Sequence, residues 1–155
     1  LIGLEIEGVA RVGAACFPAL DEVLYAADGL GAWCNEKRVH VSDVSEMKKA
    51  VFTFTSWSGF RTKKRLDIFE NLHRDCFIGR GWGDAYGVYL VATGRTEIHV
   101  EPSVALWDVA PFPPIFREAG GYFGSWSGEE GHTHGEALAV NAALKPKVME
   151  LMRGA

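Results

Sequence analysis

Short segments in which apolar and polar residues alternate make up the first part of the chain. The pattern runs over residues 2–6, turns at a Glu-Gly pair and returns over residues 9–16. Two further segments of the same kind, 22–27 and 37–41, are separated by glycine and Asn-Glu turns. The spacing predicts an antiparallel meander, and we assign residues 1–48 to the remnant of an N-terminal antiparallel sheet.

After this meander, strand-like and helix-like segments alternate to the end of the chain. Strands are expected at 51–55, 76–79, 96–101, 122–126 and 138–140. Helices are expected at 66–73, from Asp84 to Gly94, after Asp108 and from Pro146 onward. Alternation of this kind predicts a sheet flanked by helices. The expected fold class is α/β (α+β), with residues 49–155 forming a C-terminal α/β domain around a mixed sheet.

Asp108 follows a tryptophan and precedes an apolar run with helical spacing that stops at a Gly-Gly pair. An acidic residue at this point predicts the N-cap of a buried helix, and the plain interpretation is that Asp108 only caps. Pro111 is harmless if Asp108 is the N-cap, whereas Pro113 and Pro114 disfavour a regular helix in the first two turns. We therefore expect a distorted or 3₁₀-like turn over 109–114 and regular α-helix only over 115–119. Packing of Trp107 is expected to hold Asp108 in place.

Glu101 ends the predicted strand 96–101, in which Ile98 and Val100 alternate with polar residues. Ligand sites in open α/β sheets lie at the carboxyl ends of strands. Glu101 and Asp108 are therefore two carboxylates expected at one edge of the sheet. Such a pair suits a hard cation together with a polyol or phosphate ligand.

Two further patterns are weaker candidates for binding sites. Gly83-Asp84-Ala85 could present backbone N–H groups to an anion, although the plain interpretation is a helix start that Asp84 caps. His132 and His134 form an H-x-H pair, but no third metal ligand stands at a matching spacing. We favour an exposed flexible loop for the two histidines.

The composition is that of a globular chain with one core: 155 residues, 48% hydrophobic and 23% charged, with a net charge of −4. The basic run 61–65 is interpreted as a solvated loop, so neither a nucleic acid nor a membrane surface is an expected partner. The cysteines are odd in number and lack a CxxC pair, which fits a reducing cytoplasm. We expect no signal peptide and no membrane span, because the first residues lack a basic region and no apolar run is long enough.

Several of these segments together resemble a known family. In order along the chain, 91–95, Glu101, 107–110 and 118–121 are similar to the C-terminal signature of the inositol monophosphatase family, the Mg²⁺-dependent, lithium-sensitive phosphatases. The resemblance extends back through 29–33 and 41–42 and covers nearly the whole chain. It implies a layered sandwich of the sugar-phosphatase type and a Mg²⁺ cofactor. It also implies a small phosphorylated metabolite as partner and a homodimer for the full-length protein.

The resemblance assigns roles to individual residues. Asp108 matches the family aspartate that binds metal, and Glu101 matches the acid that binds substrate hydroxyls. Gly83, Asp84 and Ala85 match the turn that flanks the substrate. The family's other metal ligands, a glutamate on an N-terminal helix and the acids of an Asp-Pro-x-Asp-Gly-Thr motif, have no counterpart in this sequence. We therefore identify no catalytic residue and expect a truncated, inactive form of the fold, because one aspartate cannot hold Mg²⁺ tightly.

The residues around Asp84 favour one branch of the family. The runs 80–84 and 85–87 resemble histidinol-phosphatases, whereas inositol phosphatases usually carry serine or threonine at the position of Asp84. An additional acid suits a substrate that bears an amine and an imidazole. The expected function is a Mg²⁺-dependent phosphate-monoester hydrolase, a histidinol-phosphatase of histidine biosynthesis. Hydrolysis of inositol-1-phosphate or a related sugar or nucleotide phosphate is the alternative, and a non-catalytic α/β binding or assembly module is an alternative of another class.

Overall fold

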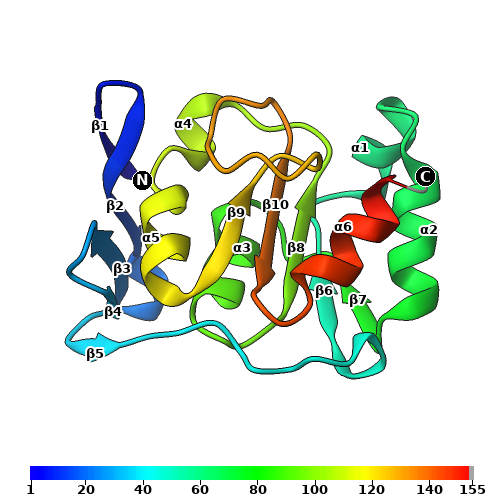
Figure 1. The fold of residues 1–155 in the computed structure, drawn as a ribbon, viewed down its shortest axis with the longest axis horizontal. Helices are drawn as coiled ribbons and strands as arrows, with labels where there is room; N and C mark the ends of the chain where they lie inside the picture. The colour runs from blue at the N-terminus through cyan, green and yellow to red at the C-terminus, as the bar shows by residue number, and fades with distance from the viewer. Residues whose placement is uncertain (154–155) are drawn as a thin grey trace.

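The computed structural model describes residues 1–153, and its first layer is an antiparallel sheet (Figure 1). Its order is β1-β2-β3-β4-β5, so each strand pairs with the next along the chain. The strands are β1 Ile2–Ile6, β2 Val9–Phe17, β3 Glu22–Ala27, β4 Ala32–Cys34 and β5 Lys37–Arg38. The turn between β1 and β2 has positive φ at Glu7 and Gly8, 53° and 78°, as a tight hairpin requires. The predicted meander is confirmed.

The second sheet is mixed and has the strand order β7-β6-β8-β10-β9. Its strands are β6 Val51–Thr53, β7 Ile78–Arg80, β8 Ile98–Glu101, β9 Gly121–Gly124 and β10 Ala137–Asn141. β6 runs parallel to both β7 and β8, and β10 is antiparallel to both β8 and β9. The predicted mixed sheet is therefore present, and its three parallel strands end at one edge.

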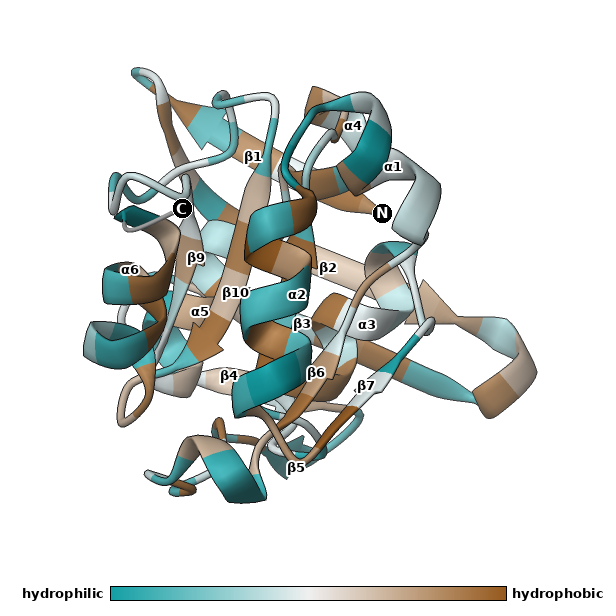
Figure 2. Ribbon diagram, turned by 90° about the vertical axis from the view of Figure 1, so that its right-hand side faces the viewer, coloured by the Kyte–Doolittle hydropathy of each residue, from teal (hydrophilic) through white to brown (hydrophobic). Residues whose placement is uncertain are grey.

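Helices form one layer between the sheets and another outside the second sheet (Figures 1 and 2). α3 (Asp84–Ala92) and α5 (Phe112–Ala119) pack with residues of both sheets in one core cluster. α2 (Leu66–Asp75) and α6 (Lys145–Arg153) cover the other face of the second sheet and form a second cluster with it. The shorter elements are α1 (Trp57–Thr62), which was not predicted, α4 (Leu106–Val109), and the 3₁₀ turns η1 (Pro18–Leu20) and η2 (Met47–Lys49).

α3 has no polar face over most of its length because it lies between the two sheets. Residues 87–92 are all buried, which is typical of a core helix rather than a surface helix. Gly94 follows the C-cap with φ +71°, so the predicted helix end is confirmed. None of the helices in the described part of the chain has the length and apolar character needed to cross a bilayer.

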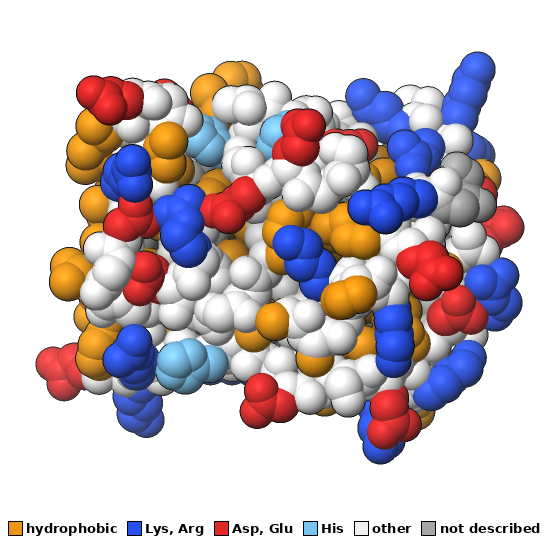
Figure 3. Space-filling model, viewed as in Figure 1, with side chains coloured by type: hydrophobic (Ala, Val, Ile, Leu, Met, Phe, Trp, Pro, Cys, Tyr) orange, Lys and Arg blue, Asp and Glu red, His pale blue; other side chains and the backbone are white. Residues whose placement is uncertain are grey.

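The face of the first sheet that points away from α3 and α5 exposes large apolar side chains. The strand register pairs Ile2 with Ala14 and Leu4 with Val12, and Ala14 pairs in turn with Tyr25. Ile2 is 73% exposed and Leu4 is 51% exposed. In Figure 3, apolar side chains line the left edge of the molecule, where this sheet lies. We call this surface, made by Ile2, Leu4, Val12 and Tyr25, the bare face.

The helix after Asp108 begins earlier than predicted. α5 starts at Phe112, so Pro113 and Pro114 lie in its first turn. The predicted start at residue 115 was wrong because the N–H groups of a first turn have no intrahelical acceptor, and prolines are tolerated there. The expected break falls instead between α4 and α5, at Ala110 and Pro111.

The predicted capping role of Asp108 is also wrong. Asp108 lies in the first turn of α4, and the N-cap of that helix is Ala105. Trp107 is 76% exposed, so its packing cannot hold Asp108 in place. Val109 is the buried residue of α4 and attaches this short helix to the core.

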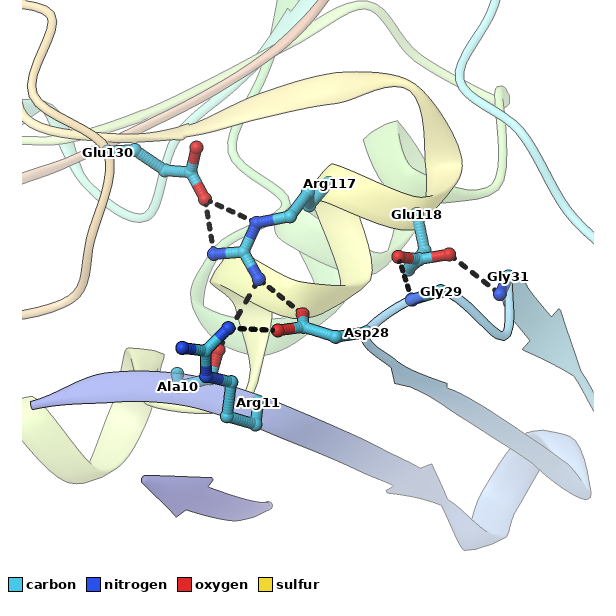
Figure 4. Close-up of polar contacts among 8 residues, drawn as sticks. All are labelled: Ala10, Arg11, Asp28, Gly29, Gly31, Arg117, Glu118 and Glu130. Carbon is cyan, nitrogen blue, oxygen red and sulfur yellow. Dashed lines mark hydrogen bonds and ion pairs between the residues drawn. The ribbon is translucent and has the colours of Figure 1, made fainter. Parts of the chain in front are cut away.

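Glu118 on α5 ties this helix to the first sheet (Figure 4). Its carboxylate accepts hydrogen bonds from the backbone N–H groups of Gly29 and Gly31, each at 2.7 Å. The two glycines lie in the turn between β3 and β4, in one of the segments that carry the family resemblance. The segments 29–33 and 118–121, which both carry the family resemblance, are therefore in direct contact.

Arg117, the neighbouring residue on α5, makes a second connection to the first sheet (Figure 4). Its guanidinium donates to Asp28, and it donates through Nε and Nη2 to Glu130 at 3.0 and 2.6 Å. Asp28 also accepts a hydrogen bond from Arg11 on β2 at 2.8 Å. The pKa of Asp28 is held below its ordinary value, chiefly by the hydrogen bond from Arg11, against the opposing effect of burial. These contacts fix α5 on the sheet and so restrain the chain that follows Asp108.

Candidate active site

A cavity of about 170 Å³ lies where the parallel strands β6, β7 and β8 end. Its lining includes residues that follow β6 and β7, the last residue of β8 and two residues of α4. Among them are Thr55, Ser56, Asp84, Ala85, Glu101 and Asp108. The carboxyl ends of parallel strands are where open α/β sheets bind ligands. The structure thus brings Asp84, Ala85, Glu101 and Asp108 to one cavity, whereas Gly83 adjoins Asp84 and is not part of the lining.

Thr55 connects the segments that follow β6, β7 and β8. Its hydroxyl accepts a hydrogen bond from the backbone N–H of Asp84 at 2.8 Å and donates to the carboxylate of Glu101. Gly83 permits this approach because a Cβ at that position would overlap Thr55. Sequence reasoning missed Thr55. The available signal was a Thr-Ser pair directly after a strand that ends at the same edge as Glu101.

Asp84 is not the N-cap of α3. Gly83 occupies that position in an extended conformation, and Asp84 is the first helical residue, with φ +54°. Positive φ is uncommon for residues other than glycine, and such conformations gather at functional sites. The N-cap residue offers no side chain to the helix, and the N–H of Asp84 donates to Thr55 instead. The carboxylate of Asp84 lines the cavity.

Glu101 and His99 lie on β8 and are buried, with 8% and 0% exposure. Nδ1 of His99 is 2.8 Å from Oγ1 of Thr53, and Nε2 is 3.1 Å from Oε1 of Glu101. Sequence reasoning did not single out His99, because a polar residue that alternates with apolar ones in a strand usually faces solvent. Here all four residues of β8 are buried, since helices cover both faces of the second sheet.

The carboxylates of Asp84, Glu101 and Asp108 give the cavity the oxygen ligands that Mg²⁺ prefers. Asp108 is exposed, in contrast to Glu101. Within residues 1–153, no three His, Cys, Asp or Glu side chains lie close enough together to hold a metal ion. These donors therefore fit Mg²⁺ in kind but do not form a complete site by themselves.

The two histidines of the loop before β10 lie in different surroundings. His132 is 8% exposed, and its Nε2 lies 2.9 Å from Oε2 of Glu5 on β1. His134 is half-buried, with Nδ1 3.8 Å from Oε2 of Glu129. The expectation of an exposed loop was therefore wrong for His132, which helps to join this loop to the first sheet.

Two sheets with a helical layer between them and a cavity lined by carboxylates at the strand ends define a layered α/β protein with a candidate ligand site. The model of the inositol monophosphatase family matches residues 1–154. The chain belongs to the inositol monophosphatase family. The structure of inositol monophosphatase from Anabaena (Nostoc) sp. PCC 7120 has a TM-score of 0.88 and 29% sequence identity, over 99% of this chain and 62% of that chain. The resemblance and the fold type expected from the sequence are confirmed.

The similar proteins include two histidinol-phosphatases. That of Chlorobaculum parvum is 37% identical over 145 residues, which cover 93% of this chain and 56% of the relative. That of Mycobacterium tuberculosis is 36% identical over 154 residues, covering 96% of this chain and 59% of the relative. The chain thus spans between half and two thirds of the length of these two relatives.

Proposed function

We propose that this chain supplies the substrate-side part of a Mg²⁺-dependent phosphate-monoester hydrolase whose substrate is histidinol-phosphate. The observation that carries the proposal is the pair of acidic residues, Asp84 and Glu101, linked through Thr55 at one cavity. Carboxylates bind ammonium and imidazolium groups through charge-assisted hydrogen bonds, and histidinol-phosphate has both groups. Family membership and the two histidinol-phosphatase relatives support the reaction class.

Each predicted site residue has a role in this proposal. Asp108 is the metal-binding residue, while Glu101 and the turn formed by Gly83, Asp84 and Ala85 bind the organic part of the substrate. When bound, Mg²⁺ neutralises phosphoryl oxygens and lowers the pKa of the attacking water. Thr55 holds the carboxylate of Glu101 and the backbone of Asp84 in a fixed relation, so the two acids are positioned together.

We further infer that residues 1–155 alone do not hydrolyse the substrate. Mg²⁺ gives up its water only when several carboxylates or a substrate phosphate anchor it, and residues 1–153 contain no group of three metal ligands. A homodimer stays a prediction, as does a cytoplasmic location, which the free thiols of Cys16, Cys34 and Cys76 support.

The test is a chimera in which this chain replaces the matched part of the Chlorobaculum parvum histidinol-phosphatase. We expect the chimera to release phosphate from histidinol-phosphate in the presence of Mg²⁺, and residues 1–155 alone to release none at any Mg²⁺ concentration. The relative itself is the positive control. A folded chimera that binds Mg²⁺ but hydrolyses no phosphate monoester would reject the proposal and favour a non-catalytic binding module.

Inositol-1-phosphate is the second candidate substrate, because Glu101 can accept a hydrogen bond from a hydroxyl as well as from an ammonium group. The likeness to the Anabaena inositol monophosphatase supports this alternative. Asp84→Ser and Glu101→Gln in the chimera should change the ratio of activities on the two substrates more than they change the Mg²⁺ dependence. Equal losses on both substrates would count against a role in specificity.

A further inference from the structure

His99 is a fully buried imidazole beside the cavity that the proposed function does not use. It lies two residues before Glu101 on β8, so both side chains project from the same face of the strand. Its ring packs directly against Gly87 of α3, where a Cβ would overlap the imidazole. Burying a polar ring is costly unless its nitrogens are hydrogen-bonded, so the position of each ring proton matters.

The hydroxyl of Thr53 limits which nitrogen of His99 carries a proton. Thr53 pairs with His99 across the parallel strands β6 and β8, and its Oγ1 lies 2.8 Å from Nδ1 and 3.2 Å from the carbonyl oxygen of Ile98. A hydroxyl has one proton to donate. If Thr53 donates to Nδ1, the neutral ring carries its proton on Nε2.

The other neutral arrangement is unfavourable. If Thr53 donated to Ile98, Nδ1 would carry the ring proton and the lone pair of Nε2 would face Oε1 of Glu101 at 3.1 Å. Two acceptors would then be in contact in a buried place, which is costly. A doubly protonated ring also carries a proton on Nε2. For an ionised Glu101, every acceptable arrangement therefore makes Nε2–H a donor beside its carboxylate.

The Nε2–H group is close to Glu101 but is not aligned with it, and it has no hydrogen-bond partner within residues 1–153. Oε1 of Glu101 accepts from Thr55, and this is the one hydrogen bond that residues 1–153 donate to the carboxylate. A rotation of the carboxylate would align Oε1 with the His99 donor as well. Oε2 would then be the oxygen left for a ligand.

We propose that His99 is a positioning residue for Glu101. Its Nε2–H and the hydroxyl of Thr55 together hold Oε1, which directs Oε2 toward the hydrogen-bond donor of the ligand, an amine or a hydroxyl. This inference rests on the proposed function for the identity of the ligand. Because His99 acts on the binding carboxylate and not on the phosphate, it affects substrate binding and leaves the chemical step unchanged.

The first test observes the His99 ring directly by nitrogen-15 NMR of residues 1–155, with His99→Gln used to assign the signals. We expect a proton on Nε2, and we expect Glu101→Gln to shift the Nε2 resonance more than the Nδ1 resonance. Thr53→Val should shift Nδ1 instead. A ring protonated only on Nδ1, or one that does not respond to Glu101→Gln, would overturn the inference. If the bare face causes association, the same spectra are recorded on the chimera.

The second test measures kinetics in the chimera with two substitutions of the same residue. His99→Phe keeps a ring against Gly87 but removes the donor, and should raise KM for histidinol-phosphate by about ten- to a hundredfold while kcat changes little. His99→Gln keeps a donor and should recover much of the loss. Melting temperatures separate this effect from a loss of folding.

The outcomes distinguish this inference from the proposed function. An unchanged KM in a folded His99→Phe variant, or a loss confined to kcat, would overturn the positioning role. A wild-type chimera without activity would reject the proposed function, whereas the NMR spectra alone would still decide whether His99 holds Glu101.

Discussion

The two sheets of the molecule differ in how many of their faces are covered. Every residue of β8 and β10 in the second sheet is buried, because α3 and α5 lie on one side and α2 and α6 on the other. In the first sheet only one face packs on helices, and every residue of β1 is exposed. A sheet with one solvated face normally carries polar residues there. The bare face is apolar instead, with Ile2, Leu4, Val12 and Tyr25 all exposed.

The difference has a consequence for function. The cavity lies at the edge of the fully covered sheet, where buried strands hold Glu101 and His99 in fixed positions. The first sheet contributes no residue to the cavity lining within the described chain, and it is connected to the site through α5. Substitutions in the second sheet should therefore change binding and stability, whereas those on the bare face should change association.

The largest expected effect is the loss of packing in the helical layer between the sheets. Phe116 on α5 is 1% exposed, and its ring centroid lies 5.6 Å from that of Phe123 on β9. Phe116→Ala should lower the free energy of unfolding by about 3–5 kcal/mol, measured by urea denaturation. The matched change on the bare face, Leu4→Ala, should cost no more than about 0.5 kcal/mol. Equal losses would show that the bare face is covered in solution.

The next largest effect is a loss of activity, without a loss of stability, on substitution of Asp108. Asp108→Asn in the chimera should lower phosphate release by at least about a hundredfold if Asp108 is a metal ligand. The melting temperature should stay close to that of the parent, because Asp108 is exposed and does not cap α4. Normal activity with a lowered melting temperature would assign Asp108 to the fold instead of the site.

Much of this arrangement could be predicted from residue patterns. The alternation in the first part of the chain predicts the meander, and the rule that ligands bind at strand ends places Glu101 and Asp108 at one edge. Asp84 was expected near them only through the family resemblance. The roles of Thr55 and His99 were not predictable in this way. Both depend on contacts between strands, and a sequence period does not show that helices cover both faces of β8.

The errors near Asp108 have a physical cause as well. Prolines disfavour helix interiors, but the pattern could not show that Pro113 and Pro114 belong to a first turn, where their missing N–H groups cost no hydrogen bond. Likewise, Glu118 could be recognised only as part of a family pattern. Its hydrogen bonds to Gly29 and Gly31 join residues 89 and 87 positions apart, which no local period can predict.

A smaller effect tests the connection between the two regions. Glu118→Ala removes a carboxylate that accepts two backbone hydrogen bonds and should lower the free energy of unfolding by about 2 kcal/mol. Glu150→Ala, at an exposed position on α6, is the control and should change stability by less than about 0.5 kcal/mol. Equal effects would mean that the turn of Gly29 and Gly31 is held by other contacts.

The smallest expected effect is the pH dependence of stability that arises from Asp28, which accepts hydrogen bonds from Arg11 on β2 and Arg117 on α5. The pKa of Asp28 is lowered in the folded chain, mainly by the hydrogen bond from Arg11 and then by that from Arg117, while burial acts in the opposite direction. A carboxyl group whose pKa is lower in the folded than in the unfolded state adds stability at pH values above its unfolded pKa, about 3.9. That stability is lost as the pH falls through the folded pKa.

The free energy of unfolding is measured at pH values from 7 down to below the folded pKa of Asp28. It should decrease less steeply for Asp28→Asn than for the parent, and the two curves should converge at low pH. The difference should be modest, because the side chain of Asp28 is 28% exposed and water screens its ion pairs. Arg11→Gln should reproduce part of the change, since Arg11 is the main cause of the shift. Parallel curves for Asp28→Asn and the parent would show that these contacts between α5 and the first sheet do not depend on the charge of Asp28, and the connection would then rest on Glu118 and apolar packing.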